Sequence, residues 1–124
     1  MKGDPIEPTS RRALVVDDDE AIRRVLARAI GQSGWAVDVV ATGAEALQTF
    51  KVGRYNLVMT DIDLGDGLDG ITLARQLLTL EPTLRIRLMS GTSSTHVDRA
   101  KAAGLGPILE KPFEFQEIAK LLEE

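Results

Sequence analysis

The sequence predicts an α/β fold in which one parallel sheet carries helices on both faces. Short apolar runs alternate five times with segments whose apolar residues recur at helical spacing. This alternation is typical of parallel sheets, because each helix returns the chain to the start of the next strand. The length of 124 residues suffices for one buried core but not for a second domain.

The strands are expected where apolar residues run together, and the third of them ends directly at Asp61. The fourth carries Arg85 and Arg87, although a central parallel strand is normally apolar on both faces. Arg87 is therefore expected to lay its stem along the core and keep its guanidinium in water. The five expected strands span residues 13–16, 36–40, 57–60, 85–89 and 108–109.

The helices are expected where apolar residues recur every three or four positions. The first covers 22–30 and is expected to end at Gly31 and Gly34. Thr42 is a suitable N-cap for the second, which is expected to stop near Gly53. The other three are expected near 71–81, 95–103 and 115–122, and three arginines of the first helix are expected to face solvent: Arg23, Arg24 and Arg28.

Right-handed crossovers restrict the ways in which these units can be connected. The natural choice is a flavodoxin-like, doubly wound sheet with the strand order 2-1-3-4-5 and five helices. Residues 1–12 contain charges and prolines but no apolar core, so they are expected to be a flexible tail and not a signal peptide. The folded domain is expected to span 13–124.

Composition argues against several classes of protein. The net charge of −4 does not favour a nucleic-acid-binding face. No apolar run approaches the roughly 20 residues that span a bilayer. Cysteine is absent, so disulfides and thiolate metal sites are impossible. We therefore expect a cytoplasmic protein without direct contact to membrane or nucleic acid.

Residues that carry chemistry follow four of the expected strands. In open α/β sheets, sites form at the carboxyl ends of the strands, and the order 2-1-3-4-5 places strand three between strands one and four. Asp61 is therefore expected beside the acidic cluster that follows strand one. The residues at these strand ends are Asp17, Asp18 and Asp19 after the first, Asp61 and Asp63 after the third, Ser90 after the fourth and Lys111 after the fifth.

Carboxylates crowded at one edge of a sheet repel one another and need a cation or protons. Oxygen ligands without histidine or cysteine select a hard ion, Mg²⁺ or possible substitutes such as Mn²⁺. A lysine and a hydroxyl at the same place add donors for anionic oxygens. Together these groups form the parts of a phosphoryl-transfer site.

The chain resembles the response-regulator receiver domains of two-component signalling, which include the chemotaxis regulators. The resemblance runs from about Ala13 to the C-terminus and rests on four motifs in order. Each motif is weak alone, and the four together at the expected strand ends are specific. They are Leu-Val-Val-Asp-Asp-Asp-Glu at 14–20, Tyr-Asn-Leu-Val-Met-Thr-Asp at 55–61, Met-Ser-Gly at 89–91, and Ala-Gly at 103–104 with Leu-Glu-Lys-Pro-Phe at 109–113.

The resemblance implies that Asp61 accepts a phosphoryl group. Asp17 and Asp18 would hold Mg²⁺ together with Asp61, and the backbone carbonyl of Asp63 would be a further ligand. Lys111 would pair first with the acceptor carboxylate and then with the phosphoryl oxygens. Such a domain catalyses its own phosphorylation and dephosphorylation and is not a conventional turnover enzyme.

The resemblance also implies partners and a switch. The donor would be a phosphohistidine on a sensor histidine kinase or a histidine phosphotransfer protein, and a downstream protein target would read the result. Ser90 would hydrogen-bond to the attached phosphoryl group and change the face formed by the fourth helix, the fifth strand and the fifth helix. Ile108 stands where the family usually has a switch tyrosine or phenylalanine, so the usual coupling to ring rotation cannot operate. The loop 62–70 is one residue longer than the commonest pattern and lacks its usual proline, so a local change of the loop is expected.

Other functions stay open from the sequence. The chain could be a receiver-like interaction module that is never phosphorylated, an alternative that Ile108 supports. Asp61-Ile62-Asp63 resembles the nucleophile motif of haloacid-dehalogenase-type phosphatases, but that motif normally lies ahead of most of the fold. A flavodoxin-type FMN carrier would need a phosphate loop where the three aspartates stand. The aspartates could also simply cap the first helix, and Lys111 could be a solvated surface residue.

Overall fold

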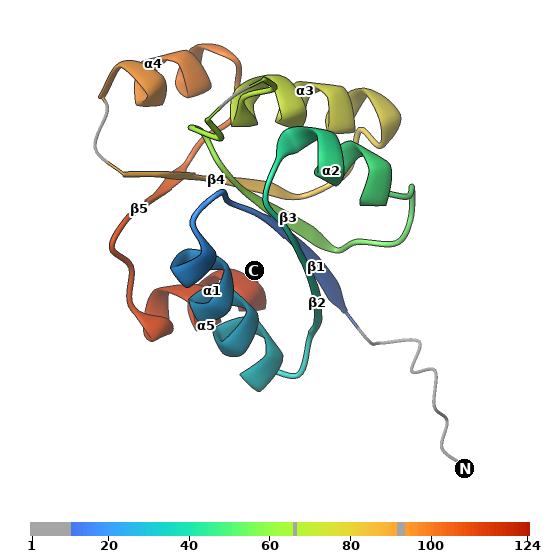
Figure 1. Cartoon of the computed structure of the whole chain (residues 1–124), viewed down its shortest axis with the longest axis vertical. Coiled ribbons are helices and arrows are strands. Elements are labelled where there is room, and N and C mark those ends of the chain that lie inside the picture. Colours follow the sequence, from blue (N-terminus) through green and yellow to red (C-terminus); the bar gives the residue numbers. More distant parts are fainter. Residues whose placement is uncertain (1–10, 66, 92–93) are drawn as a thin grey trace.

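The computed structural model describes residues 11–65, 67–91 and 94–124. Five strands form one parallel sheet in the order β2-β1-β3-β4-β5 (Figure 1), so the predicted topology is confirmed. Each strand lies within one or two residues of its expected position. The strands are β1 (Arg12–Val16), β2 (Ala36–Val40), β3 (Leu57–Asp61), β4 (Ile86–Ser90) and β5 (Ile108–Glu110).

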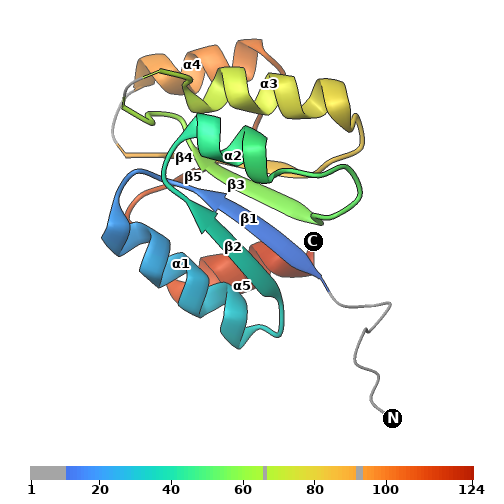
Figure 2. The same ribbon diagram turned by 45° about the vertical axis from the view of Figure 1, so that its right-hand side comes forward.

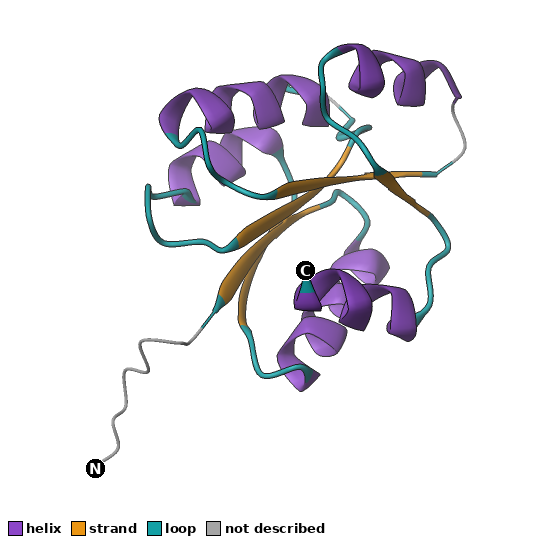
Figure 3. Cartoon of the chain, turned by 180° about the vertical axis from the view of Figure 1, so that it is seen from behind, coloured by secondary structure: helices purple, strands orange, loops and turns teal. Residues whose placement is uncertain are grey.

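Helices cover both faces of the sheet, as the alternating pattern predicts. Figures 1 and 2 show α1 and α5 side by side on one face and α2, α3 and α4 on the other. The view from behind in Figure 3 shows the same three layers, with the strands between the two groups of helices. The helices are α1 (Glu20–Gln32), α2 (Gly43–Thr49), α3 (Gly70–Leu80), α4 (Ser94–Ala102) and α5 (Phe115–Glu123).

The core has one part on each face, because side chains alternate along a strand. In β1, Ala13 and Val15 pack with α1 and α5, whereas Leu14 and Val16 pack with α2 and α3. All four are fully buried. A smaller cluster, which includes Leu88 and Ala100, lies under α3 and α4. The part of a strand that is buried on both sides must be apolar, which is why residues 13–16 of β1 form an unbroken apolar run.

Helix ends follow local capping chemistry. Thr42 caps α2 as predicted, since its hydroxyl accepts the Glu45 N–H while the Glu45 carboxylate accepts the Thr42 N–H. The helix ends at Thr49, before Gly53. The prediction that Gly31 ends the first helix is wrong, because α1 continues through it to Gln32. Gly34 follows with φ of +91°, a left-handed conformation that glycine adopts without steric cost.

The arginines of β4 have partners on α5 that local patterns do not reveal. The strand begins at Ile86, one residue later than expected. Arg85 lies before it and donates to the Leu121 carbonyl over 3.0 Å. The Arg87 guanidinium does not simply point into water: it donates to Oε1 of Glu124 over 2.9 Å, and the Arg87 side chain is only 18% exposed. A carboxylate at the end of the chain therefore allows a charged residue in an inner strand.

Within the part of the chain that the structure describes, no helix is long and apolar enough to cross a membrane. The expected tail over 1–12 lies outside the described residues except for its last two. Of these, Arg12 belongs to β1, so the first strand begins one residue earlier than predicted. Arg12 pairs with Asp38 of β2 over 3.2 Å, and its N–H donates to the Asn56 side chain.

Candidate functional site

The candidate site lies at the carboxyl ends of the parallel strands, where the sequence predicted it. The register pairs Val16 of β1 with Thr60 of β3. Asp17 and Asp61, the next residue of each segment, therefore come to the same level beside one another. Lys111 follows β5 directly, and its N–H donates to the Ser90 carbonyl at the end of β4 over 2.8 Å. Four segments far apart in the sequence thus meet at one edge of the sheet.

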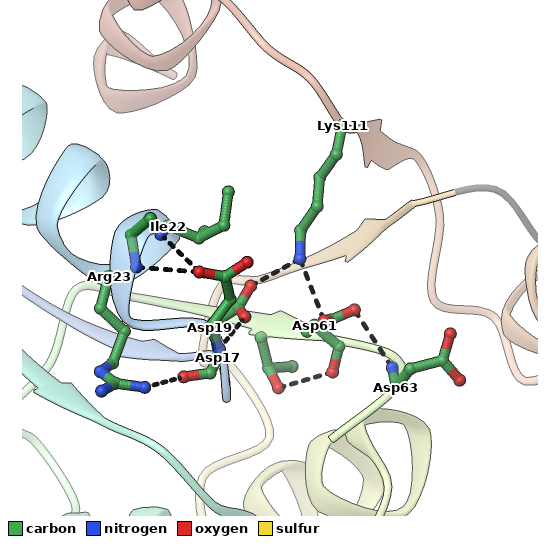
Figure 4. Close-up of polar contacts among 9 residues, drawn as sticks. Asp17, Asp19, Ile22, Arg23, Asp61, Asp63 and Lys111 are labelled. Carbon is green, nitrogen blue, oxygen red and sulfur yellow. Dashed lines mark hydrogen bonds and ion pairs between the residues drawn. The ribbon is translucent and has the colours of Figure 1, made fainter. Parts of the chain in front are cut away.

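Lys111 joins the two buried carboxylates (Figure 4). Its Nζ lies 2.7 Å from Oδ2 of Asp17 and 3.0 Å from Oδ2 of Asp61. Asp17 is completely buried and Asp61 is 6% exposed. An ammonium group at hydrogen-bonding distance from both oxygens offsets the repulsion between the two negative charges. The reading of Lys111 as a solvated surface lysine is therefore wrong.

The second oxygen of each buried carboxylate accepts a backbone N–H. Oδ1 of Asp17 accepts from Asp19 over 2.9 Å, and Oδ1 of Asp61 accepts from Asp63 over 3.1 Å. Each carboxylate is thus held at two points by groups from the protein. Such fixed donors orient the oxygens before any ligand arrives.

Burial and pairing act in opposite directions on the charges of the site. Burial raises the pKa of Asp61, and the bond from Lys111 opposes this effect only in part. Burial alone would lower the pKa of Lys111, but the bonds to Asp17 and Asp61 outweigh it, so that the pKa of Lys111 is raised. The lysine is therefore held in its cationic form, and a further cation near Asp61 would favour the carboxylate.

Three carboxylates form a group that fits a hard divalent ion. One oxygen each from Asp17, Asp18 and Asp61 lies within 4.8 Å of the other two. Asp18 is the exposed member and can be approached from solvent. All donors are oxygen, which favours Mg²⁺ or Mn²⁺ over softer metals. The chemistry of the donor set thus agrees with the predicted metal site.

The loop after β3 takes a course that requires glycine. Gly65 and Gly67 have φ of +75° and +84°, which proline cannot adopt. A Cβ atom on Gly65 would lie 3.3 Å from Oδ2 of Asp18, so the loop passes close to the acidic group. The carboxylates of Asp17, Asp18 and Asp61 converge beside this longer loop.

The other three predicted residues, Ser90, Asp63 and Ile108, have different positions relative to the acidic group. Ser90 is the last residue of β4, not the first after it, and is 3% exposed. Among the described residues, none hydrogen-bonds to its hydroxyl. The Asp63 side chain is exposed and points away from the other carboxylates in Figure 4, so only its backbone faces the site. Ile108 pairs with Leu88 and packs, half-buried, against the cluster that contains Ala100.

The structure gives Asp19 and Arg23 roles that differ from the main interpretation of the sequence, in which Asp19 belonged to the acidic group and Arg23 faced solvent. Asp19 does cap α1, since its carboxylate accepts the N–H of Ala21 over 2.8 Å, whereas Asp17 and Asp18 do not share that role. Arg23 was expected to face solvent but is half-buried and donates to the Asp17 carbonyl over 2.8 Å. Helical side chains lean toward the N-terminus, so an arginine one turn after the cap can reach back to the preceding loop. The position of Arg23 one turn after the N-cap Asp19 was the signal in the sequence that could have predicted this contact.

The fold and the site together define the receiver domain of a response regulator. The chain matches the family described as "Response regulator receiver domain" over residues 13–123, and it belongs to that family. Receiver domains of this family are signalling domains and not conventional turnover enzymes. The phosphatase and FMN-carrier readings are not favoured by any of these similarities.

Similar proteins agree with this assignment. Response regulator receiver protein CpdR of Brucella abortus (strain 2308) is 29% identical over 115 residues, which cover 92% of this chain and 95% of CpdR. DNA-binding transcriptional regulator NtrC of Escherichia coli (strain K12) is 34% identical over 88% of this chain, but the matching part is only 23% of NtrC. The chain thus spans nearly all of one relative and about a quarter of the other.

Solved structures show the same architecture. A response regulator receiver domain protein (CheY-like) from Methanospirillum hungatei JF-1 has a TM-score of 0.83 and 26% identity, with 93% of this chain and 92% of that chain covered. The non-phosphorylated HemR receiver domain from Leptospira biflexa has a TM-score of 0.81 and 27% identity, with 92% of each chain covered.

Proposed function

We propose that this receiver domain accepts a phosphoryl group on Asp61 with the help of Mg²⁺. One observation carries the proposal: Lys111 bonds to both Asp17 and Asp61, and Asp18 completes the acidic group beside them. An acidic cluster without a lysine would support a metal site only. Lys111 adds a positive charge next to Asp61, and a phosphoryl acceptor needs such a charge in addition to the metal ion.

Asp61 would act as the nucleophile. A carboxylate oxygen attacks phosphorus, a new P–O bond forms, and the P–N bond to the donor histidine breaks so that its electron pair returns to the imidazole. The carboxylate is a weak nucleophile toward an anionic phosphoryl group because the charges repel. Lys111 favours the ionised form of Asp61 and can stabilise the developing negative charge, since its ammonium already lies 3.0 Å from the acceptor oxygen.

Asp17, Asp18 and Asp61 would hold the ion, and the backbone carbonyl of Asp63 is the proposed fourth protein ligand. When bound, Mg²⁺ would neutralise part of the charge on the phosphoryl oxygens and help to orient them. Mn²⁺ has the same ligand preferences and is expected to substitute.

Ser90 and the face beyond it would transmit the change. Ser90 ends β4 and its carbonyl accepts the Lys111 N–H, so the two proposed contacts of the phosphoryl group are linked through the backbone. Attachment of the phosphoryl group would favour one arrangement of α4, β5 and α5 over another. The aliphatic packing of Ile108 means that this shift would not use rotation of an aromatic ring.

The proposed partners are a sensor histidine kinase or a histidine phosphotransfer protein as donor, and a downstream protein as target. The NtrC relative is longer than this chain and is named as DNA-binding. For the receiver domain itself we propose protein partners and no direct contact with nucleic acid. A cytoplasmic location stays a prediction.

The test is incubation of the purified chain with acetyl phosphate and Mg²⁺, followed by intact-mass measurement. One attached phosphoryl group should add about 80 Da. The gain should be absent in Asp61→Asn and in the presence of a chelator. If the unchanged chain gains no mass under conditions in which it is folded, the interaction module that is never phosphorylated becomes the better assignment.

A further inference from the structure

Arg23 holds the loop that carries the acidic residues. Its guanidinium NH1 donates to the main-chain carbonyl of Asp17 over 2.8 Å, as Figure 4 shows. The side chain is half-buried, so the bond is partly shielded from water. Hydrogen bonds from a charged donor are stronger than those between neutral groups. The neighbouring Arg24 differs: it pairs with Glu20 on the exposed side of α1, and its side chain is 77% exposed.

The Asp17 peptide units are fixed from both sides. The Asp17 N–H donates to the Val40 carbonyl of β2 over 3.2 Å, and the Asp17 carbonyl accepts from Arg23. The Asp17 carboxylate is also bonded twice, to the Asp19 N–H and to Lys111. The position of Asp17 is therefore determined by contacts to three other segments of the chain.

Asp18 has no comparable support of its own. It is the exposed member of the acidic group, and no hydrogen bond to its carboxylate is present within the described residues. Its direction depends on the backbone on each side of it. The peptide unit before it contains the Asp17 carbonyl, and that unit is planar. A donor that fixes the carbonyl oxygen therefore also fixes the plane from which the Asp18 Cα and side chain extend.

From these contacts we infer that Arg23 is a positioning residue for the metal site: it orients the Asp17–Asp18 peptide and thereby aims the Asp18 carboxylate at the ion. The inference rests on the proposed function, since it concerns the same acidic group. Arg23 does not contact the ion or the phosphoryl group. Its cationic charge is expected to matter less than the direction of its hydrogen bond.

Arg23 could affect the affinity for Mg²⁺ through its charge or through its hydrogen bond, and these two effects have opposite signs. The inference can therefore be tested. If Arg23 acted only through its charge, its removal would strengthen Mg²⁺ binding, because a positive charge near the ion would be lost. If Arg23 positions a ligand, its removal should weaken binding, typically about 10- to 100-fold for a group that orients a ligand. Arg24→Ala removes the same charge from the next residue without touching the loop, so it measures the effect of charge alone.

The experiment is titration of the folded chain with Mg²⁺ by calorimetry, for the unchanged protein, Arg23→Ala, Arg23→Lys and Arg24→Ala. We expect affinity at least about 10-fold weaker in Arg23→Ala, unchanged or slightly tighter in Arg24→Ala, and intermediate in Arg23→Lys, which keeps a donor on a different stem. Affinity in Arg23→Ala that equals or exceeds that of Arg24→Ala would overturn the inference. Arg23→Lys serves for the same comparison if Arg23→Ala does not fold.

A second measurement needs no metal. The Asp19 amide donates to the Asp17 carboxylate, so its hydrogen exchange reports how firmly the loop is held. Exchange should accelerate in Arg23→Ala and not in Arg24→Ala, and equal rates in these two variants would contradict the inference. If the unchanged protein binds no Mg²⁺, the proposed function fails while amide exchange still decides whether Arg23 fixes the loop.

Discussion

Gly70, the first residue of α3, lies directly against the backbone of Asp61. A Cβ atom on Gly70 would overlap the Asp61 carbonyl oxygen and would lie 2.9 Å from both the Asp61 carbonyl carbon and the Ile62 Cα. The Gly70 N–H donates to the Ile62 carbonyl over 2.9 Å. The start of α3 therefore supports the backbone that carries the proposed acceptor, and only a residue without a side chain fits there.

The variant Gly70→Ala should be strongly destabilised. The new methyl group meets backbone atoms, which cannot rotate away, so β3 and α3 must separate. We expect the free energy of unfolding to fall by about 3 kcal/mol, at the upper end for an overpacked site. Urea denaturation followed by circular dichroism measures the change.

Gly31→Ala is the matched control for that substitution. Gly31 lies inside α1, where an added Cβ atom would have no neighbour within 4 Å. Alanine is the better helix former, so this variant should be more stable by about 0.5–1 kcal/mol. Equal effects of the two substitutions would mean that the close approach to Asp61 does not constrain the fold.

Replacing Lys111 with methionine should destabilise the metal-free protein. The substitution removes the cation between two buried carboxylates and leaves their charges uncompensated. Breaking such a pair costs about 3 kcal/mol or more, and addition of Mg²⁺ should recover part of the loss. Urea denaturation in a chelator and in Mg²⁺ measures both effects. Lys51→Met, at an exposed position, should change stability little in either condition, and a loss of the same size there would contradict the assigned role of Lys111.

Tyr55 should ionise at a higher pH in the folded chain than in the unfolded chain. Burial raises its pKa above the ordinary 10.0, and the hydrogen bond of its hydroxyl to Oδ2 of Asp38, 2.7 Å long, acts in the same direction. Because the folded state binds this proton more tightly, the stability from Tyr55 is complete below pH 10 and is lost as pH rises through the folded pKa. Tyr55 is the only tyrosine, so ultraviolet absorbance reports its ionisation without interference.

The control for the pH prediction is Tyr55→Phe. This variant should lose about 1 kcal/mol of stability at neutral pH, since the Asp38 carboxylate loses a donor. Its unfolding free energy should also vary less between neutral pH and pH values above 10. A folded-state ionisation midpoint at or below that of the urea-unfolded chain would show that the phenol is not held as described.

The pair between Arg87 and Glu124 should respond asymmetrically to substitution. Arg87→Leu exchanges a mostly buried cation for an apolar side chain in an inner strand, so stability should stay the same or rise. Glu124→Ala leaves the guanidinium without its partner and should cost up to about 1 kcal/mol, because Glu124 is half-exposed and water screens the pair. Thermal denaturation of both variants tests this, and a larger loss for Arg87→Leu than for Glu124→Ala would refute it.

Most of the candidate site could be predicted because its residues lie at or just beyond the carboxyl ends of the predicted strands. Asp17, Asp61 and Lys111 come after apolar runs whose carboxyl ends must meet at one edge of a parallel sheet. Once the strand order is known, their neighbourhood follows. Arg23 was missed because its partner is the backbone carbonyl of Asp17, and residue type does not show which carbonyls accept a side-chain hydrogen bond; only the spacing from the N-cap of α1 indicated that Arg23 could reach it.

Local patterns in the chain were enough to locate the strands within one or two residues, to predict the capping of α2 by Thr42 and to identify the acidic group. Apolar periodicity and capping chemistry act over a few residues. Three-dimensional packing was needed to show that Lys111 bridges Asp17 and Asp61, which lie 94 and 50 positions away, and that Arg87 finds Glu124. Those contacts depend on how side chains from separate strands and helices are turned toward one another, and that is fixed only when all the layers pack together.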